Sequence, residues 1–309
     1  MLFRIDFRAM GTNMIAMLDS SSSQAPDELS QVPNWFEDWE QTLSRFRKDS
    51  ELNQLNRSAG WPVHVSQTIW EVFQAAVAAE TASEGLVKAT VLDAMLNIGY
   101  DRSLEELPHE RPLQEVTPWN KIPSLAEVSL DEKNQTICLP ADVHLDFGGI
   151  AKGWAAQQAA NKLSKWGPAL VSAGGDMAIT GERPNAELWP VTIDDPFNQG
   201  EVIANLGLGA CGIATSGTDY RRWKMGGRWN HHIVDPRTGQ SAQTDLVAAS
   251  IIAPDVLQAE MAAKAVIILG SQDGMRWIEA RPGFSAMLVT ETNGEIILSN
   301  HISQFFWRS

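Results

Sequence analysis

Cysteine, long apolar runs and positive charge are all scarce in this chain of 309 residues. Its two cysteines, Cys138 and Cys211, lie far apart and outside any metal-ligand spacing, which predicts buried free thiols. No stretch approaches the roughly 18 consecutive apolar residues that predict a transmembrane helix. Lys and Arg number 24 against 38 Asp and Glu, a net charge of −14, which argues against nucleic acid and anionic membranes as partners.

Several common cofactor and catalytic motifs are also absent. No Gly-x-Gly-x-x-Gly opens a helix after the first predicted strand, which excludes a Rossmann dinucleotide domain. The P-loop pattern Gly-x-x-x-x-Gly-Lys-Ser is missing, and so is the Gly-x-Ser-x-Gly pattern of a nucleophile elbow. No segment repeats at a fixed period, which excludes a solenoid or a propeller.

The first residues alternate charged and apolar side chains. Arg4, Asp6 and Arg8 interrupt the apolar positions, so this stretch lacks the apolar region of a signal peptide and predicts a cytoplasmic protein. The same alternation predicts two strands within residues 3–18, joined by a turn at Gly11-Thr12.

Periodicity over the rest of the chain predicts a mixture of helices and short strands. Predicted helices cover residues 29–46, 66–83, 152–165, 256–269 and 271–281. Predicted strands cover residues 128–130, 136–139, 143–145, 169–172, 177–180, 189–193, 202–208, 212–215, 248–253, 285–290 and 295–299. Four prolines and two glutamate-rich stretches in residues 105–127 predict a surface connection. Because strands and helices do not alternate regularly, the fold class predicted is α+β.

The densest group of candidate site residues lies at His144–Gly153, which reads His-Leu-Asp-Phe-Gly-Gly-Ile-Ala-Lys-Gly. A strand would deliver Asp146 to the Gly-Gly turn, and a helix begins almost at once. Amide groups at the start of a helix, together with Lys152, form an anion site. In the alternative reading Asp146 caps the helix and the glycines serve only the turn.

Three further segments combine turns with polar side chains. Gly174-Gly175-Asp176 is typical of a tight hairpin. Thr215 and Ser216 follow a predicted strand and allow a flat or phosphorylated ligand to approach closely, or else form an ordinary Ser/Thr turn. In His231–Gly239 two adjacent histidines on a strand would point to opposite faces, so they cannot both bind one metal ion. One histidine with Asp235 offers a proton-handling pair, although a pair of histidines is more often structural.

Taken in order, these segments resemble one family, the FAD:protein FMN transferases, or ApbE-type flavin transferases. Any one match is weak, and the ordered set is specific and spans nearly the whole chain. The matching stretches are Ala9–Thr12, Leu43–Leu52, Gly99–Ser103, Asp146–Gly153, Ser172–Asp176, Ala214–Gly217, His231–Gly239 and Ile251–Pro254.

The resemblance implies a single α+β domain over residues 1–309, in two joined lobes connected near residues 105–127, with FAD in a groove between them. It implies transfer of FMN from FAD to a Ser or Thr hydroxyl of an acceptor protein, with release of AMP. Members of the family normally use Mg²⁺ to offset the charge of the pyrophosphate, and some hydrolyse FAD to FMN and AMP.

Carried over position by position, the resemblance also yields candidate site residues. The candidates for binding FAD are Met10, Phe46, Leu86, Val87, Lys88, Asp146, Lys152, Thr215, Ser216 and Val234. Gly149 and Glu260 occupy positions where the family binds the metal ion. His232, with support from Asp235, is the candidate for handling a proton near the pyrophosphate, and Lys264 completes the catalytic set.

Two departures from the family pattern concern the metal ion. The family's late helix reads Ala-Asp-x-x-x-Thr, with the Asp and Thr facing the metal, where this chain has Glu260 and Lys264. The family's Gly-Ala-Phe-Asp-Pro-Thr is replaced here by Gly85–Thr90, which carries Lys88 at the acidic position. We hypothesise that ammonium groups stand where the ion would sit and hold the pyrophosphate directly. The alternatives are a non-catalytic FAD-binding protein with solvent-facing lysines, and an FAD pyrophosphatase.

Overall fold

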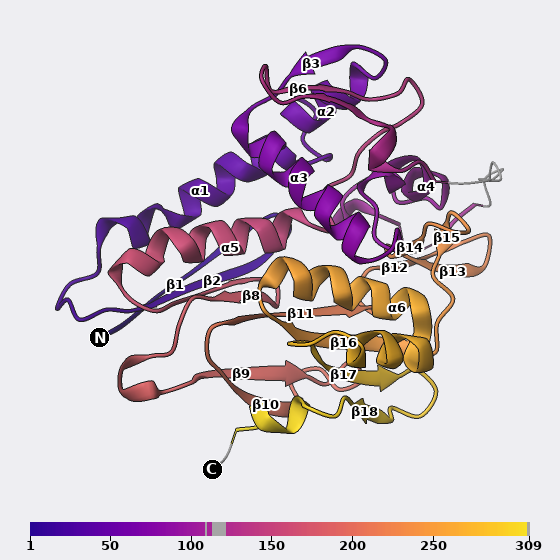
Figure 1. The fold of residues 1–309 in the computed structure, drawn as a ribbon. Coiled ribbons are helices and arrows are strands. Elements are labelled where there is room, and N and C mark those ends of the chain that lie inside the picture. The colour runs from indigo at the N-terminus through magenta and orange to yellow at the C-terminus, as the bar shows by residue number, and fades with distance from the viewer. Residues whose placement is uncertain (109, 113–121, 308–309) are drawn as a thin grey trace. The chain divides into compact units, whose positions relative to one another are not determined.

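The computed structural model describes residues 1–108, 110–112 and 122–307, so residues 113–121 of the predicted surface connection 105–127 lie outside the described part of the chain (Figure 1). Within these residues the chain forms two compact units. The first comprises residues 1–37, 152–217 and 244–309, and the second comprises residues 38–151 and 218–243. Helices and strands are mixed in the manner expected, so the prediction of an α+β fold is confirmed.

The first unit is built on an eight-stranded sheet in which every neighbouring pair is antiparallel. In spatial order its strands are β1 Leu2–Ala9, β2 Thr12–Asp19, β7 Ala169–Ala173, β8 Asp176–Ile179, β11 Cys211–Gly217, β16 Leu246–Ala253, β17 Ser285–Thr290 and β18 Ile296–Leu298. The first hairpin turns at Met10 and Gly11, one residue earlier than predicted, because Thr12 already pairs with Ala9. Both turn residues have positive φ, 48° and 70°, as a two-residue hairpin of this type requires.

Both faces of this sheet are covered near its centre. On β11, Ile213 packs with the two-stranded sheet of β9 Trp189–Asp194 and β10 Val202–Leu208, whereas its neighbour Ala214 packs against Ala259 of helix α6. Successive side chains of a strand point to opposite faces, so this alternation places the helix on one face and β9–β10 on the other. All eight residues of β16 are buried for the same reason.

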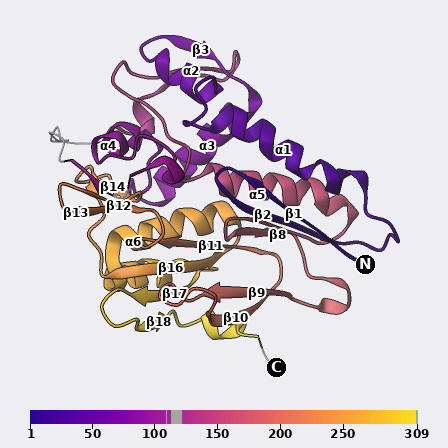
Figure 2. The ribbon, with the colours of Figure 1, turned by 180° about the vertical axis from the view of Figure 1, so that it is seen from behind.

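Helix α6, Val256–Glu279, lies along β11 and β16 (Figures 1 and 2). Asp255 caps its start by accepting a hydrogen bond from Gln258 N–H. The helix is interrupted at Gly270, whose φ of 80° is not helical, which explains why the sequence predicts two helices here. The other helices of this part of the chain are α1 Asp27–Leu43, which continues past residue 37, and α5 Ala151–Leu163.

The second unit combines short helices with small sheets. Its helices are α2 Glu51–Arg57, α3 Gln67–Ala82 and α4 Leu92–Asn97. Its small sheets contain β3 Pro62–His64, β5 Ser129–Asp131 and β6 Thr136–Cys138 in one, β4 Glu110–Arg111, β12 Arg222–Met225 and β13 Arg228–His231 in another, and β14 Val234–Asp235 with β15 Gln240–Ser241 in a third. Ser66 caps α3 as predicted, by accepting from Ile69 N–H.

Two expectations about this unit are corrected. Residues 105–127 do not connect the two units, because the described residues on both sides of the gap belong to the second unit. This segment also contributes to the core, since Leu107 and Ile122 pack in the buried cluster that contains Trp223. Residues 143–145 form no strand, because the main chain of Leu145 is held by the buried side chain of Asn56 at 2.8 and 2.9 Å.

No helix within the described residues combines the length and the apolar composition needed to cross a membrane.

Candidate functional site

Four charged side chains of the first unit are linked by ion pairs, and we call Lys152, Asp176, Glu260 and Lys264 the lysine–carboxylate quartet. Lys264 Nζ lies 3.0 Å from Glu260 Oε1, one helical turn away on α6. Lys152 Nζ, in the first turn of α5, lies 3.3 Å from the same oxygen and 2.5 Å from Asp176 Oδ2. Asp176 is the first residue of β8. The sequence predicted that Glu260 and Lys264 share a helix face, and their ion pair confirms this.

The quartet is buried but balanced in charge. Glu260 is 1% exposed and Asp176 is 4% exposed. Burial raises the pKa of Asp176, and Lys152 opposes this shift. Burial also acts to raise the pKa of Glu260, but the ammonium groups of Lys264 and Lys152 outweigh it, and the pKa is lowered. Burial lowers the pKa of Lys264 against the attraction of Glu260. Two carboxylates and two ammonium groups sum to no net charge.

Gly153 allows α5 and α6 to approach each other at the quartet. Its N–H donates to Glu260 Oε2 at 3.0 Å, and a Cβ atom at this position would lie 2.5 Å from that oxygen. The glycine therefore lets a main-chain amide serve as the third partner of the buried carboxylate.

We expect Gly153→Ala to destabilise the protein, although alanine favours a helix over glycine by about 1 kcal/mol. The clash with Glu260 outweighs this gain and should lower the free energy of unfolding by about 1–3 kcal/mol in total. Urea denaturation followed by circular dichroism measures this difference. A variant as stable as the parent, or more stable, would show that α6 moves freely away from α5.

The quartet does not have the donor set of a magnesium site. Mg²⁺ prefers several oxygen ligands in octahedral geometry, with few competing cations. Here both oxygens of Glu260 already accept hydrogen bonds. Oε1 accepts from two ammonium groups and Oε2 accepts from a main-chain N–H. A divalent ion about 4 Å from one ammonium group would be repelled by about 8 kcal/mol at an effective dielectric constant of about 20. Over the ranges that the structure describes, no three His, Cys, Asp or Glu side chains gather to hold a metal ion.

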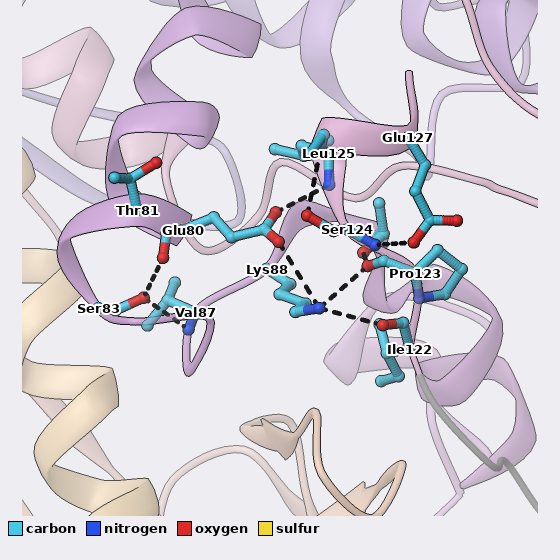
Figure 3. A network of polar contacts seen from close by, with 12 residues as sticks. Glu80, Thr81, Ser83, Val87, Lys88, Ile122, Pro123, Ser124, Leu125 and Glu127 are labelled. Atoms are coloured by element: carbon cyan, nitrogen blue, oxygen red, sulfur yellow. Dashed lines mark hydrogen bonds and ion pairs between the residues drawn. The ribbon is translucent and has the colours of Figure 1, made fainter.

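Lys88 has a different environment, shown in Figure 3. Its ammonium group donates to the carbonyl oxygens of Ile122 at 3.0 Å and Pro123 at 3.3 Å, and it lies 3.6 Å from Glu80 Oε1. The other oxygen of Glu80 accepts from Leu125 N–H at 3.0 Å. These contacts hold residues 122–125 against the end of α3. The charge of Lys88 balances Glu80 and its three N–H groups face these oxygens, so contact of Lys88 with the pyrophosphate stays a prediction that requires these partners to be exchanged.

Asp146 is buried and is held by two partners within the second unit. Its Oδ1 accepts from Gly148 N–H at 2.5 Å, and its Oδ2 lies 2.6 Å from Arg45 Nε. The Asp146 N–H donates to Ala89 O at 2.8 Å. The aspartate thus closes the Gly-Gly turn that contains Gly149, as the sequence predicted, but its carboxylate also forms an ion pair that the sequence did not predict.

Arg45 is the residue that sequence reasoning missed. Its side chain is 6% exposed, and its guanidinium carbon lies 4.1 Å from the ring centre of Phe46 and 4.6 Å from that of Tyr100. Among the described residues its Nη2 atom has no hydrogen-bond partner, although it is buried. A buried N–H group without a partner is uncommon and suits a site that a ligand completes. The only signal in the sequence was its place beside Phe46, inside a stretch that matches the family.

We expect Arg45→Lys to weaken FAD binding by at least about tenfold, because a lysine cannot both pair with Asp146 and present a second N–H in the plane of a guanidinium. The measurement is the FAD dissociation constant from quenching of flavin fluorescence. Arg57→Lys is a matched control, since Arg57 is an exposed arginine that donates to Lys48 O. Equal affinity of the parent and Arg45→Lys would remove Arg45 from the site.

The remaining candidates for the flavin site are distributed over both units. In the first unit, Met10 lies at the positive-φ turn between β1 and β2. In the second unit, Phe46 exposes 46% of its surface, enough of an aromatic ring for a flat ligand to stack on. Leu86 is half-buried and Val87 is buried, with Val87 N–H donating to Ser83 Oγ at 3.0 Å.

Thr215 and Ser216 lie inside β11 and not in a loop after it, which corrects their predicted setting. Thr215 is exposed, and its hydroxyl lies 2.8 Å from that of Ser250 on the neighbouring strand. Ser216 is buried. The alternation of a strand places the two side chains on opposite faces, so one face of β11 presents only Thr215 of this pair.

The two adjacent histidines lie in different surroundings. His231 ends β13, and its ring is held by main-chain groups, with Nδ1 accepting from Ile233 N–H at 3.3 Å and Nε2 lying 2.9 Å from Ala242 O. This pattern places the proton of His231 on Nε2 and gives the residue a structural role. His232 lies in the bend that follows, and its N–H donates to Arg221 O. It stays the candidate for proton handling.

Asp235 and Val234 form the short strand β14. The carboxylate of Asp235 binds Arg237 through two nitrogens, with Nη2 at 2.8 Å and Nε at 2.9 Å. This Asp235–Arg237 pair stabilises the turn to Gly239, and the support of His232 by Asp235 stays a prediction. The side chain of Val234 packs in the core cluster with Trp223. Val234 could therefore contact a ligand only through its main-chain atoms.

Known proteins similar to this chain point to one family. The model of the ApbE family matches residues 10–288. A curated FAD:protein FMN transferase of Haemophilus influenzae is 26% identical over 305 residues, covering 95% of this chain and 88% of that protein. One from Treponema pallidum is 29% identical over 278 residues, covering 84% and 76%.

Solved structures show the same fold. The crystal structure of the ApbE protein of Thermotoga maritima superposes with a TM-score of 0.86 at 24% identity and covers 100% of both chains. The apo form of the flavinyl transferase ApbE of Pseudomonas stutzeri gives a TM-score of 0.81 at 21% identity, covering 100% of this chain and 98% of that one.

Proposed function

Because this chain belongs to the ApbE family, we propose that it is an FAD:protein FMN transferase, which moves FMN from FAD to a Ser or Thr hydroxyl of an acceptor protein. The observation that carries the proposal is the match over residues 10–288, which contains the matching segments of the sequence apart from Ala9. Curated relatives with this activity cover most of the chain.

In the proposed reaction the hydroxyl oxygen of the acceptor attacks the phosphorus of the FMN half of FAD. A new bond forms between this oxygen and phosphorus, and the bond from phosphorus to the oxygen bridging to AMP breaks. The hydroxyl proton passes to a base, for which we propose His232, and AMP leaves with the bridging oxygen. Asp146, held by Arg45, would orient FAD, and Phe46 would stack on one of its rings.

A non-catalytic FAD-binding protein is the second candidate, and one observation favours it. The position where the family places a metal ligand carries Lys264, and two ammonium groups surround Glu260. Loss of a Lewis acid removes a large part of the stabilisation of a phosphoryl-transfer transition state. Binding of FAD does not require that stabilisation.

Chromatography of the nucleotides distinguishes these functions. The protein is incubated with FAD in two reactions. One contains an acceptor peptide that carries a Ser/Thr flavinylation motif, and the other contains no peptide. A transferase releases AMP only with the peptide, and an FAD pyrophosphatase releases AMP and FMN without it. Intact FAD that elutes with the protein in both reactions would overturn the transferase and support the second candidate.

A further inference from the structure

We propose that this chain binds the diphosphate of FAD without a divalent cation, because the ammonium group of Lys264 takes the place of the ion in the lysine–carboxylate quartet. The proposal rests on the proposed function only in requiring that the chain binds FAD. It concerns how the charge of the ligand is offset, which the family of the chain does not settle.

Both oxygens of Glu260 already have cationic or main-chain partners. Its Oε2 accepts from Gly153 N–H at 3.0 Å. Its Oε1 lies 3.0 Å from Lys264 Nζ and 3.3 Å from Lys152 Nζ. A metal ion bound to Glu260 would lie beside two ammonium groups, which repel it. The geometry therefore describes a carboxylate that already holds its cations.

Lys264 has a hydrogen-bond donor available for a ligand. An ammonium group has three N–H donors. Those of Lys264 face Glu260 Oε1 at 3.0 Å and the carbonyl oxygen of the same residue at 3.4 Å. Within the described part of the chain the third donor has no further acceptor, and 15% of the side chain is exposed. A phosphate oxygen can accept this hydrogen bond.

Each carboxylate of the quartet has its own ammonium group, because Asp176 pairs with Lys152 at 2.5 Å and Glu260 pairs with Lys264 at 3.0 Å. Lys264 thus balances Glu260 without an ion. A lysine acts on phosphate as a compact point charge.

The first test is a titration of the unaltered protein with FAD, followed by flavin fluorescence, in buffer with EDTA and in buffer with Mg²⁺. We expect dissociation constants that agree within about twofold. An affinity that rises about tenfold or more when Mg²⁺ replaces EDTA would overturn the proposal and leave FAD binding intact. Absence of FAD binding in both buffers would instead overturn the proposed function and this proposal with it.

The second test uses variants of Lys264 in EDTA. We expect Lys264→Met to weaken FAD binding by about tenfold or more and Lys264→Arg to retain most of the affinity. Lys133→Met, at an exposed turn, is the matched control and should bind as the parent does. Circular dichroism checks that each variant is folded. If folded Lys264→Met binds FAD as tightly as Lys133→Met, the proposal is wrong.

The third test restores the family pattern. Glu260→Asp combined with Lys264→Thr removes one ammonium group and offers a carboxylate and a hydroxyl to an ion. We expect calorimetry with Mn²⁺ alone to detect binding to this double variant and none to the parent. Mn²⁺ binding to the parent with an affinity equal to that of the double variant would contradict the proposal.

Discussion

Glu260→Gln should be the most destabilising conservative substitution in the first unit. The change keeps the size of the side chain but leaves Lys152 and Lys264 with one buried carboxylate, Asp176, between them. Breaking a buried ion pair by removing one partner costs about 3–5 kcal/mol, because the remaining charge is uncompensated. Urea denaturation should show this loss in the free energy of unfolding.

Two further variants locate the cause of this loss. Adding Lys264→Met to Glu260→Gln removes the uncompensated ammonium group and should restore most of the stability. Asp6→Asn removes the acid of an exposed pair with Arg4 and should leave stability unchanged within error. A loss below about 1 kcal/mol for Glu260→Gln would mean that water already solvates the quartet.

His232→Ala should lower the rate of FMN transfer by about 10²–10⁴-fold while FAD affinity stays nearly unchanged. A general base acts on the proton of the acceptor hydroxyl in the transition state and contributes little to the binding of FAD. The measurement is the rate of AMP release at saturating FAD and acceptor peptide, with the dissociation constant of FAD taken separately from fluorescence.

The neighbouring histidine provides the comparison. His231→Ala removes a ring whose two nitrogens are bound by main-chain groups, so its main effect should be a lower melting temperature. His64→Ala changes an exposed histidine and controls for loss of an imidazole as such. A transfer rate for His232→Ala within about threefold of the parent would exclude His232 as the base.

Most of the fold of the first unit followed from local patterns. Alternation predicted β1 and β2, and the break at Gly270 divided the last helix where the sequence predicted two. The missed features are those in which the main chain finds partners far away in the sequence. Residues 143–145 read as a strand, but Asn56, 89 positions before Leu145, satisfies the main chain there.

The sequence predicted which acids belong to the candidate site but not which cations pair with them. Motifs identify Asp146 and Glu260 by their place in the chain, and the structure shows that both are buried. Motifs do not reveal which cation pairs with each acid. The pairing of Asp146 with Arg45 and of Glu80 with Lys88 depends on side chains that the fold brings together.

The mass of an acceptor protein tests the proposed function most directly. The protein is incubated with FAD and an acceptor bearing a Ser/Thr flavinylation motif, and the acceptor is then denatured and weighed by mass spectrometry. We predict that the acceptor gains the mass of one FMN less one water and that changing its Ser or Thr to Ala abolishes the gain. An acceptor of unchanged mass, in a reaction where FAD binding is verified and a known flavin transferase modifies the same acceptor, would contradict the account.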